Sequence, residues 1–138
     1  MFNITILPNE YNLITIDKNS SFVEPFLKII FCKDFTIMDE LLDFHISQHE
    51  ISIIVPHRYK DLFKQCGSTG TYTAIRVDTD NPGLEEAGII ANLTSVIKTY
   101  NITILAISTF KCNYIFIPSV EMHVFHKMIS EQSVFTVI

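Results

Sequence analysis

Short runs of β-branched and aromatic residues alternate along the chain with stretches whose apolar positions recur at helical spacing. In the first half, the pattern predicts strands over 2–7, 12–16 and 51–55 and helices over 22–31 and 57–65. Residues 35–45 fit a helix and a strand equally well. Pro8-Asn9-Glu10 has the composition of a turn, so the chain is expected to start with a hairpin. Ser20 or Ser21 is the expected N-cap of the first helix.

The second half repeats this alternation more regularly. Its expected elements are a strand over 72–77, a helix over 84–100, strands over 103–108 and 114–117, a helix over 120–129 and a strand over 134–137. This order is that of a split βαβ, or ferredoxin-like, domain. The low-complexity stretch Gly67-Ser68-Thr69-Gly70 is the expected boundary between the halves. The sequence therefore predicts an α+β protein of two tandem βαββαβ domains, 1–66 and 71–138, the first of them degenerate.

Composition narrows the range of partners. The chain is 48% hydrophobic, but no apolar run approaches the roughly 18 to 20 residues that span a bilayer, so no membrane association is predicted. The net charge is −5 and no cluster of Lys or Arg is present, which argues against nucleic acid as a partner. The start of the chain has no signal-peptide pattern, and three cysteines form no pairing or metal-ligand pattern. These features predict reduced thiols and a cytoplasmic location.

The segment from Asp80 to Leu93 is the most informative part of the sequence. A proline stops the preceding strand, and Gly83 and Gly88 allow main chain to pass close to a neighbour without a Cβ in the way. The helix that follows directs its unpaired N–H groups and positive dipole end toward this loop, where they could hold a carboxylate or phosphate. We therefore interpret the loop as a ligand loop. Gly88 could instead serve close packing of helix on sheet, and Glu86 could simply complement the helix dipole.

The sequence contains no convincing catalytic or metal-binding motif. His45 and His49, and His123 and His126, have spacings that would bring each pair onto one helical face, but neither has a third ligand nearby. Cys112 has no neighbouring base in sequence to activate it, and no catalytic-triad order, phosphate loop or dinucleotide fingerprint is present. We predict no enzyme activity, no metal and no cofactor.

Two segments of the second half resemble ACT domains: Gly83-Leu84-Glu85-Glu86-Ala87-Gly88-Ile89-Ile90-Ala91 and Ile104-Leu105-Ala106-Ile107-Ser108-Thr109-Phe110-Lys111-Cys112-Asn113-Tyr114-Ile115. Within these domains they are most similar to the paired ACT domains of the CASTOR family of cytosolic arginine sensors and to short bacterial relatives. Residues 26–31 and 50–55 are similar to the helix and strand of that family's degenerate first ACT domain. The resemblance covers nearly the whole chain.

The resemblance implies a ligand site between ACT domains packed side by side. Its implied ligand-binding residues are Asp80, Gly83, Glu86, Ala87, Gly88, Ile89, Ser108, Thr109, Phe110 and Asn113. The last of these departs from the family pattern, because the arginine sensors have an Asp that faces the charged ligand where this chain has Asn113. Taken alone, Asn113 would be read as a turn residue before a strand.

By resemblance, the expected function is a non-catalytic sensor or regulatory module that binds a free amino acid, with arginine as the leading ligand. The family's sensors carry four ACT domains and this chain has room for two, so a homodimer is expected to complete the sites. The alternative is an ACT scaffold that has lost its ligand and serves as a protein-interaction module or regulatory subunit for another protein.

Overall fold

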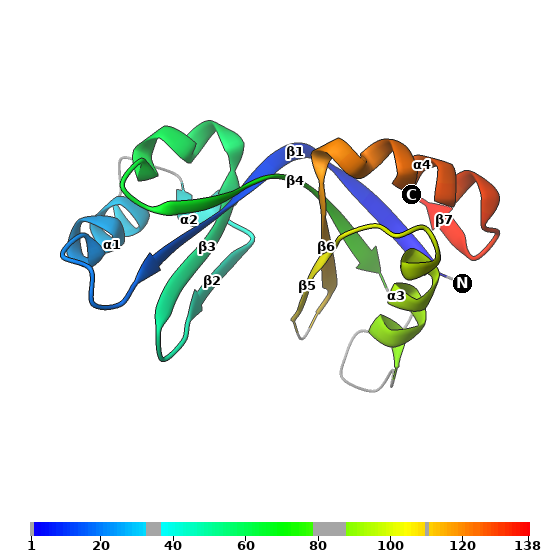
Figure 1. Ribbon diagram of the computed structural model, residues 1–138, viewed down its shortest axis with the longest axis horizontal. Helices are drawn as coiled ribbons and strands as arrows, with labels where there is room; N and C mark the ends of the chain where they lie inside the picture. The colour runs from blue at the N-terminus through cyan, green and yellow to red at the C-terminus, as the bar shows by residue number, and fades with distance from the viewer. Residues whose placement is uncertain (1, 33–36, 79–87, 110) are drawn as a thin grey trace. The chain divides into compact units, whose positions relative to one another are not determined.

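The computed structural model describes residues 2–32, 37–78, 88–109 and 111–138, which divide into two compact units. Unit 1 consists of Met1–Pro8 and Tyr72–Ile138, and unit 2 consists of Asn9–Thr71. Two long strands, β1 (Phe2–Asp17) and β4 (Gly67–Asp78), each contribute one end to each unit (Figure 1). Unit 1 is therefore discontinuous in sequence, because unit 2 is inserted after its first eight residues.

Unit 2 carries its helices over one face of a small antiparallel sheet. Its elements are the second part of β1, α1 (Val23–Phe31), α2 (Ile37–Glu40), β2 (Asp43–Ile46), β3 (Glu50–Pro56), the 3-10 helix η1 (His57–Phe63) and the first part of β4. The strand order is β2-β3-β1-β4. Alternate residues of β1 and β3, such as Ile14 and Ile53, pack with Phe26 and Ile30 of α1 and with Phe63 in one buried cluster.

Unit 1 has the same layered plan around a larger sheet. Its elements are the first part of β1, the second part of β4, α3 (Ile89–Thr99), β5 (Leu105–Ser108), β6 (Asn113–Pro118), the 3-10 helix η2 (Ser119–Glu121), α4 (Met122–Glu131) and β7 (Phe135–Val137). The strand order is β5-β6-β4-β1-β7, with β7 parallel to β1. Val77 and Ile115 of the sheet share a buried cluster with Leu93 of α3 and Phe125 of α4, so both helices cover one face.

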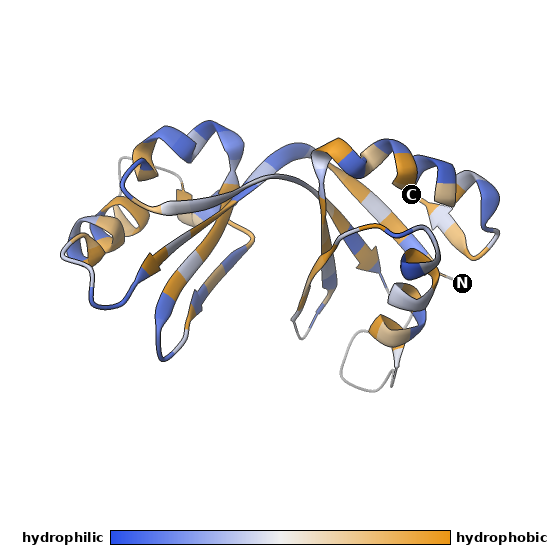
Figure 2. Ribbon diagram, viewed as in Figure 1, coloured by the Kyte–Doolittle hydropathy of each residue, from blue (hydrophilic) through white to orange (hydrophobic). Residues whose placement is uncertain are grey.

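Figure 2 colours each residue by hydropathy, and in it hydrophobic (orange) and hydrophilic (blue) segments alternate along the strands and helices. This alternation is expected of elements that bury one face in a cluster and expose the other. Burial of these side chains is the main favourable contribution to folding, at roughly 25 cal/mol per Å² of apolar surface. Among the described residues, no helix combines the length and the apolar character that crossing a lipid bilayer requires.

Most predicted elements of the chain are confirmed within a few residues. The strand predicted at 51–55 is β3, and the strands predicted at 72–77, 114–117 and 134–137 lie within or coincide closely with β4, β6 and β7. The helices predicted at 22–31 and 120–129 are α1 and α4. The N-cap of α1 is Phe22 rather than a serine, although the Ser20 hydroxyl accepts a hydrogen bond from the Phe22 N–H at 3.1 Å.

The expected hairpin at the start of the chain is wrong. Residues 2–17 form one continuous strand, and the exposed Pro8 lies at the point where this strand passes from unit 1 to unit 2. Proline is tolerated in a strand where its missing N–H is not needed for pairing. Gly67-Ser68-Thr69-Gly70 likewise belongs to β4 and not to a linker. The predicted division into domains 1–66 and 71–138 remains a prediction, and the compact units differ from it because residues 1–8 belong to unit 1.

The helix predicted over 84–100 is α3, which begins only at Ile89. Gly88 precedes it with a φ of +79°, a left-handed conformation that an α-helix cannot pass through. Residues 84–87 of the predicted helix lie outside the described residues. The short helix predicted at 57–65 is the 3-10 helix η1, and the ambiguous segment 35–45 contains α2 and the start of β2 among its described residues.

Candidate functional site

The topology of unit 1 brings several predicted ligand residues to one end of its sheet, where β4 and β5 end, β6 begins and α3 starts (Figure 1). In the antiparallel register, Asn113 of β6 is paired with Val77 of β4 on one side and with Ser108 of β5 on the other. Directly paired residues of neighbouring strands point to the same face of a sheet. Because Val77 is part of the buried cluster under α3, Asn113 and Ser108 also lie on the helix-covered face.

Asn113 and Ser108 are available for binding. Asn113 is half-buried and Ser108 is exposed. Among the described residues, neither the Asn113 carboxamide nor the Ser108 hydroxyl has a side-chain hydrogen-bond partner. No buried side-chain nitrogen or oxygen of the described residues lacks a hydrogen-bond partner, so the amide atoms of Asn113 still reach solvent. This end of the sheet therefore offers one carboxamide and one hydroxyl on the same face as α3.

The start of α3, at the same end of unit 1, has main-chain donors of its own. Gly88 is the N-cap, and its carbonyl oxygen accepts the Asn92 N–H at 2.9 Å. Gly88 has no side chain that could cap the helix, and the N–H groups of the first turn have no partner within the helix. The aligned peptide dipoles add a partial positive charge that favours a carboxylate or phosphate at this end. The half-buried Ile89 is the first residue of the helix.

Gly88 is explained in part by its backbone conformation. Apart from its neighbours in the chain, no atom of the described structure lies within 4 Å of the position that a Cβ on Gly88 would occupy, so close packing of helix on sheet does not explain this glycine. Its φ of +79° does explain it, because residues with a side chain rarely adopt this conformation. Gly88 thus allows the chain to turn sharply into α3.

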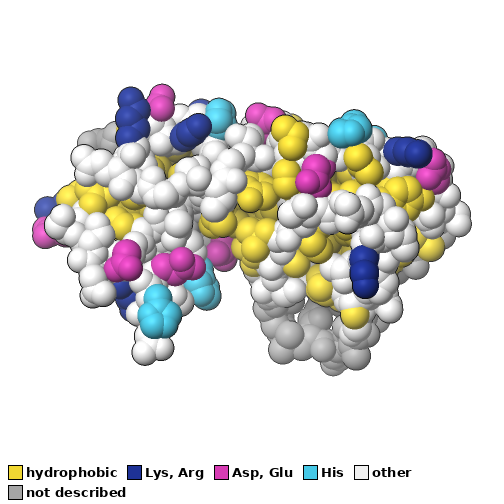
Figure 3. Space-filling view, in the orientation of Figure 1, with side chains coloured by type: hydrophobic (Ala, Val, Ile, Leu, Met, Phe, Trp, Pro, Cys, Tyr) yellow, Lys and Arg dark blue, Asp and Glu magenta, His cyan; other side chains and the backbone are white. Residues whose placement is uncertain are grey.

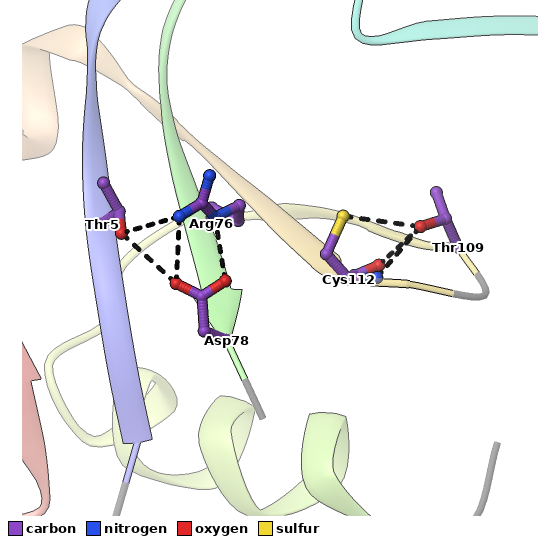
Figure 4. Close-up of polar contacts among 5 residues, drawn as sticks. All are labelled: Thr5, Arg76, Asp78, Thr109 and Cys112. Atoms are coloured by element: carbon purple, nitrogen blue, oxygen red, sulfur yellow. Dashed lines mark hydrogen bonds and ion pairs between the residues drawn. The ribbon is translucent and has the colours of Figure 1, made fainter. Parts of the chain in front are cut away.

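Thr109 is bound into the turn between β5 and β6. Its hydroxyl donates to the Cys112 carbonyl oxygen at 2.9 Å and accepts the Cys112 N–H at 3.2 Å, as Figure 4 shows. The main-chain N–H of Thr109 donates to the same carbonyl at 2.9 Å. The Thr109 side chain therefore stabilises the hairpin, and a ligand would have to compete with these bonds.

The opposite face of the sheet carries a polar cluster that the sequence pattern did not predict. Arg76 donates from Nε to Asp78 Oδ1 at 2.9 Å and from Nη2 to Asp78 Oδ2 at 3.3 Å, and the Thr5 hydroxyl donates to Asp78 Oδ2 at 3.3 Å (Figure 4). The hydrogen bond and charge of Asp78 raise the pKa of Arg76. Arg76 and Asp78 are two residues apart on one strand, a spacing that places both side chains on one face of the sheet. This spacing was the sequence feature from which the pair could have been predicted. We interpret this cluster as a link between β1 and β4.

Half of the predicted ligand residues lie outside the described residues: Asp80, Gly83, Glu86, Ala87 and Phe110. The structure therefore places the other five, of which Gly88, Ile89, Ser108 and Asn113 gather at one end of unit 1, and Thr109 lies in the adjoining turn. Among the described residues, no group of three or more His, Cys, Asp or Glu side chains could hold a metal ion. His45 lies on a strand and not on the helix that its spacing with His49 suggested.

Solved structures of other proteins are similar to this chain in fold. No protein-family model matches the chain, and no curated protein matches it as a relative. A solved structure of a protein from Agrobacterium tumefaciens is similar, with a TM-score of 0.72 and 14% identity over 99% of this chain and 92% of that one. The ligand-free regulatory subunit of aspartate kinase from Thermus thermophilus is similar with a TM-score of 0.61 and 5% identity, over 95% of this chain and 96% of that one. The fold is ACT-like.

A third similar structure is the E. coli aspartokinase III in complex with aspartate and ADP, with a TM-score of 0.57 and 13% identity. It covers 92% of this chain but only 32% of the kinase, so this chain corresponds to about a third of that enzyme. At these identities the likeness concerns the fold alone. The resemblance to ACT domains is therefore confirmed at the level of fold, whereas nothing in the comparisons supports the closer resemblance to the arginine sensors.

Proposed function

We propose that this protein is a non-catalytic regulatory module that binds a free amino acid at the end of unit 1 where α3 begins. The observation that carries the proposal is that the start of α3, whose N-cap residue Gly88 has no side chain, lies at the same end and over the same face of the sheet as Asn113 and Ser108. The side chains of Asn113 and Ser108 lack partners among the described residues. The ACT-like fold, shared with regulatory subunits of aspartate kinase, supports a regulatory role.

In the proposed binding mode, the α-carboxylate of the amino acid accepts hydrogen bonds from the first N–H groups of α3. The carbonyl oxygen of Asn113 and the Ser108 hydroxyl accept hydrogen bonds from the α-ammonium group or from a polar side chain. Among the described residues, no carboxylate takes part in this arrangement. We therefore infer a ligand that is less basic than arginine. Glu86 and Asp80 are proposed contributors from outside the described residues.

The selectivity can be reversed by one substitution. Two unit charges about 4 Å apart attract by roughly 4 kcal/mol at an effective dielectric constant of 20, before desolvation. We expect Asn113→Asp to shift preference toward arginine and lysine, and Asn101→Asp, the same charge change after the far end of α3, to leave selectivity unchanged. Calorimetric titration of the native protein and both variants with arginine, lysine, leucine, glutamine and aspartate measures their selectivity. Unchanged selectivity in Asn113→Asp would show that Asn113 does not face the ligand.

A thermal-shift screen against the common amino acids tests the function itself. An amino acid present at 100 times its dissociation constant stabilises the folded protein by about 2.7 kcal/mol. If no amino acid stabilises the protein, the proposal is wrong and the chain is better described as an ACT-like interaction module or regulatory subunit. The neutral Asn113, in place of the acid of the arginine sensors, is the observation that favours this second function.

We further propose that the protein acts in the cytoplasm as a homodimer that completes its ligand sites between ACT-like units of two copies. Several large apolar side chains are exposed, among them Phe31 (56%), Ile46 (53%) and Val120 (82%), and Figure 3 shows further hydrophobic surface between polar side chains. Sedimentation should give about twice the monomer mass of 15.8 kDa. A chain that stays monomeric with its amino acid bound would rule out a shared site.

A further inference from the structure

Unit 2 contains a cavity that the proposed amino-acid site does not use. It has a volume of about 220 Å³ and lies where η1 leads into β4. Its floor is apolar, because it includes Ile14 of β1 and Phe63 of η1, which are 1% and 2% exposed. The volume is below the roughly 300 to 1,000 Å³ of pockets for drug-sized ligands, so a small molecule is the fitting occupant.

The rim of the cavity carries two lysines. Lys60 and Lys64 line it, and Asp61 is the one acidic side chain among its lining residues. Within the described part of the chain, neither lysine has a carboxylate within 4 Å, whereas Lys28 is paired with Glu24 at 2.9 Å. Both ammonium groups are therefore available to an anion. This local excess of positive charge stands out in a chain whose net charge is −5.

Two neutral donors complete the lining. Ser68 of β4 contributes a hydroxyl that has no hydrogen-bond partner among the described residues. Cys66 contributes a half-buried thiol, and burial raises the pKa of this thiol, so it stays protonated and adds no negative charge. An apolar floor, two ammonium groups and two neutral donors are complementary to an anionic group attached to a short hydrocarbon portion.

We propose that this cavity binds a small organic carboxylate, with the carboxylate between Lys60 and Lys64 and the carbon chain against Ile14 and Phe63. The lysines could instead only complement the negative end of η1. In that case the cavity would have no preference for carboxylates over neutral molecules of the same size. The cysteine in the lining makes this difference measurable.

The test compares iodoacetate with neutral iodoacetamide as alkylating agents of the native protein. In both reactions the thiolate sulfur of Cys66 bonds to the reagent's methylene carbon, iodide leaves with the bonding electrons, and the thiol proton passes to water. We expect the ratio of iodoacetate to iodoacetamide labelling at Cys66 to exceed the ratio at Cys32 several-fold, as read by peptide mass spectrometry. Cys32 is the control because it lies outside both this cavity and the proposed amino-acid site. Butyrate should slow the labelling of Cys66 and leave that of Cys32 unchanged.

Two double variants separate the site from general charge effects. In Lys60→Gln/Lys64→Gln, the preference of Cys66 for iodoacetate should disappear, and in Lys98→Gln/Lys127→Gln, with the same change in net charge, it should persist. Equal ratios at Cys66 and Cys32, or a preference that survives the first variant, would overturn the proposal. If Cys66 reacts with neither reagent, butyrate must shift the amide NMR signals of Lys64 and Ser68 more than inorganic phosphate does, and the absence of such shifts overturns the proposal equally.

Discussion

Gly88 offers the most direct test of how the chain enters its candidate site. The residue has a φ of +79° and a ψ of 7° at the N-cap of α3. An alanine in this left-handed conformation costs roughly 1 to 2 kcal/mol in steric strain. Alanine also restricts the unfolded chain, which offsets roughly 0.4 to 1 kcal/mol. Since the described structure leaves open space around the added Cβ, no clash adds to the cost. We expect Gly88→Ala to lower the free energy of unfolding by about 1 kcal/mol.

Two further variants make this prediction specific. Asparagine tolerates the left-handed region better than alanine, so Gly88→Asn should lose less stability than Gly88→Ala. Gly70 has a φ of +109° and equally open space around its Cβ position, so Gly70→Ala should cost at least as much without touching the candidate site. Urea unfolding followed by circular dichroism gives the three free energies. The reasoning about backbone strain would be refuted if Gly88→Ala were as stable as the native protein or if Asn were worse than Ala.

Two other predictions concern stability. Phe26 is 0% exposed and makes an edge-to-face contact with Phe63 at a ring-centroid distance of 5.4 Å, so Phe26→Ala should lower the free energy of unfolding by about 3 to 5 kcal/mol in urea titrations. A loss below about 1 kcal/mol would contradict the packing of unit 2. Burial raises the pKa of Asp43 above its ordinary 3.8, with His45 opposing the shift, so the ionised form is disfavoured in the folded state. The penalty is absent below about pH 3.8 and grows as pH rises through the folded-state pKa. Asp43→Asn should therefore raise the urea midpoint at pH 7 but not at pH 3, and an equal gain at both pH values would exclude this cause.

The parts of the fold that could be predicted from sequence are those with a local cause. The runs 51–55 and 114–117 consist mostly of β-branched and aromatic residues, and they lie in strands β3 and β6 as expected. Helix α1 follows from the spacing of its apolar residues, of which Phe26 and Ile30 are fully buried. In these segments, the local preference and the tertiary structure agree.

The errors arise where long-range pairing overrides composition. Pro8-Asn9-Glu10 and Gly67-Ser68-Thr69-Gly70 have turn and linker compositions, but they lie within β1 and β4, which are neighbours in the sheet. The Asn12 side chain donates to the Gly70 carbonyl oxygen at 2.8 Å, and this contact joins residues 58 positions apart. The composition of a short segment does not predict pairing with a segment so distant in the sequence. For the same reason, the insertion of β1 between β7 and β4 was not anticipated.

Part of the candidate site could be predicted because the resemblance to ACT domains indicates ligand-binding positions. Local sequence patterns do not indicate these positions. Asn113 alone would be read as a turn residue, whereas the register with Val77 and Ser108 places it on the helix-covered face. The hydrogen bonds between the Thr109 hydroxyl and Cys112 could not be inferred from sequence, and the ligand role of Thr109 stays a prediction. The open space around Gly88 excludes close packing on the sheet as its role, and its positive φ could not be inferred from sequence.

The discontinuity of unit 1 has a consequence for the order of folding during synthesis. All residues of unit 2 are contiguous, so they can leave the ribosome together and fold early. The first strand segment of unit 1 must wait, because Phe2 pairs with Phe135 and Ile4 with Val137, almost the whole length of the chain away. At about 5 to 20 residues per second, this leaves an apolar strand without its β7 partner for several seconds after unit 2 has emerged. A nascent chain stalled before Phe135 should therefore contain a folded unit 2 and a protease-sensitive unit 1.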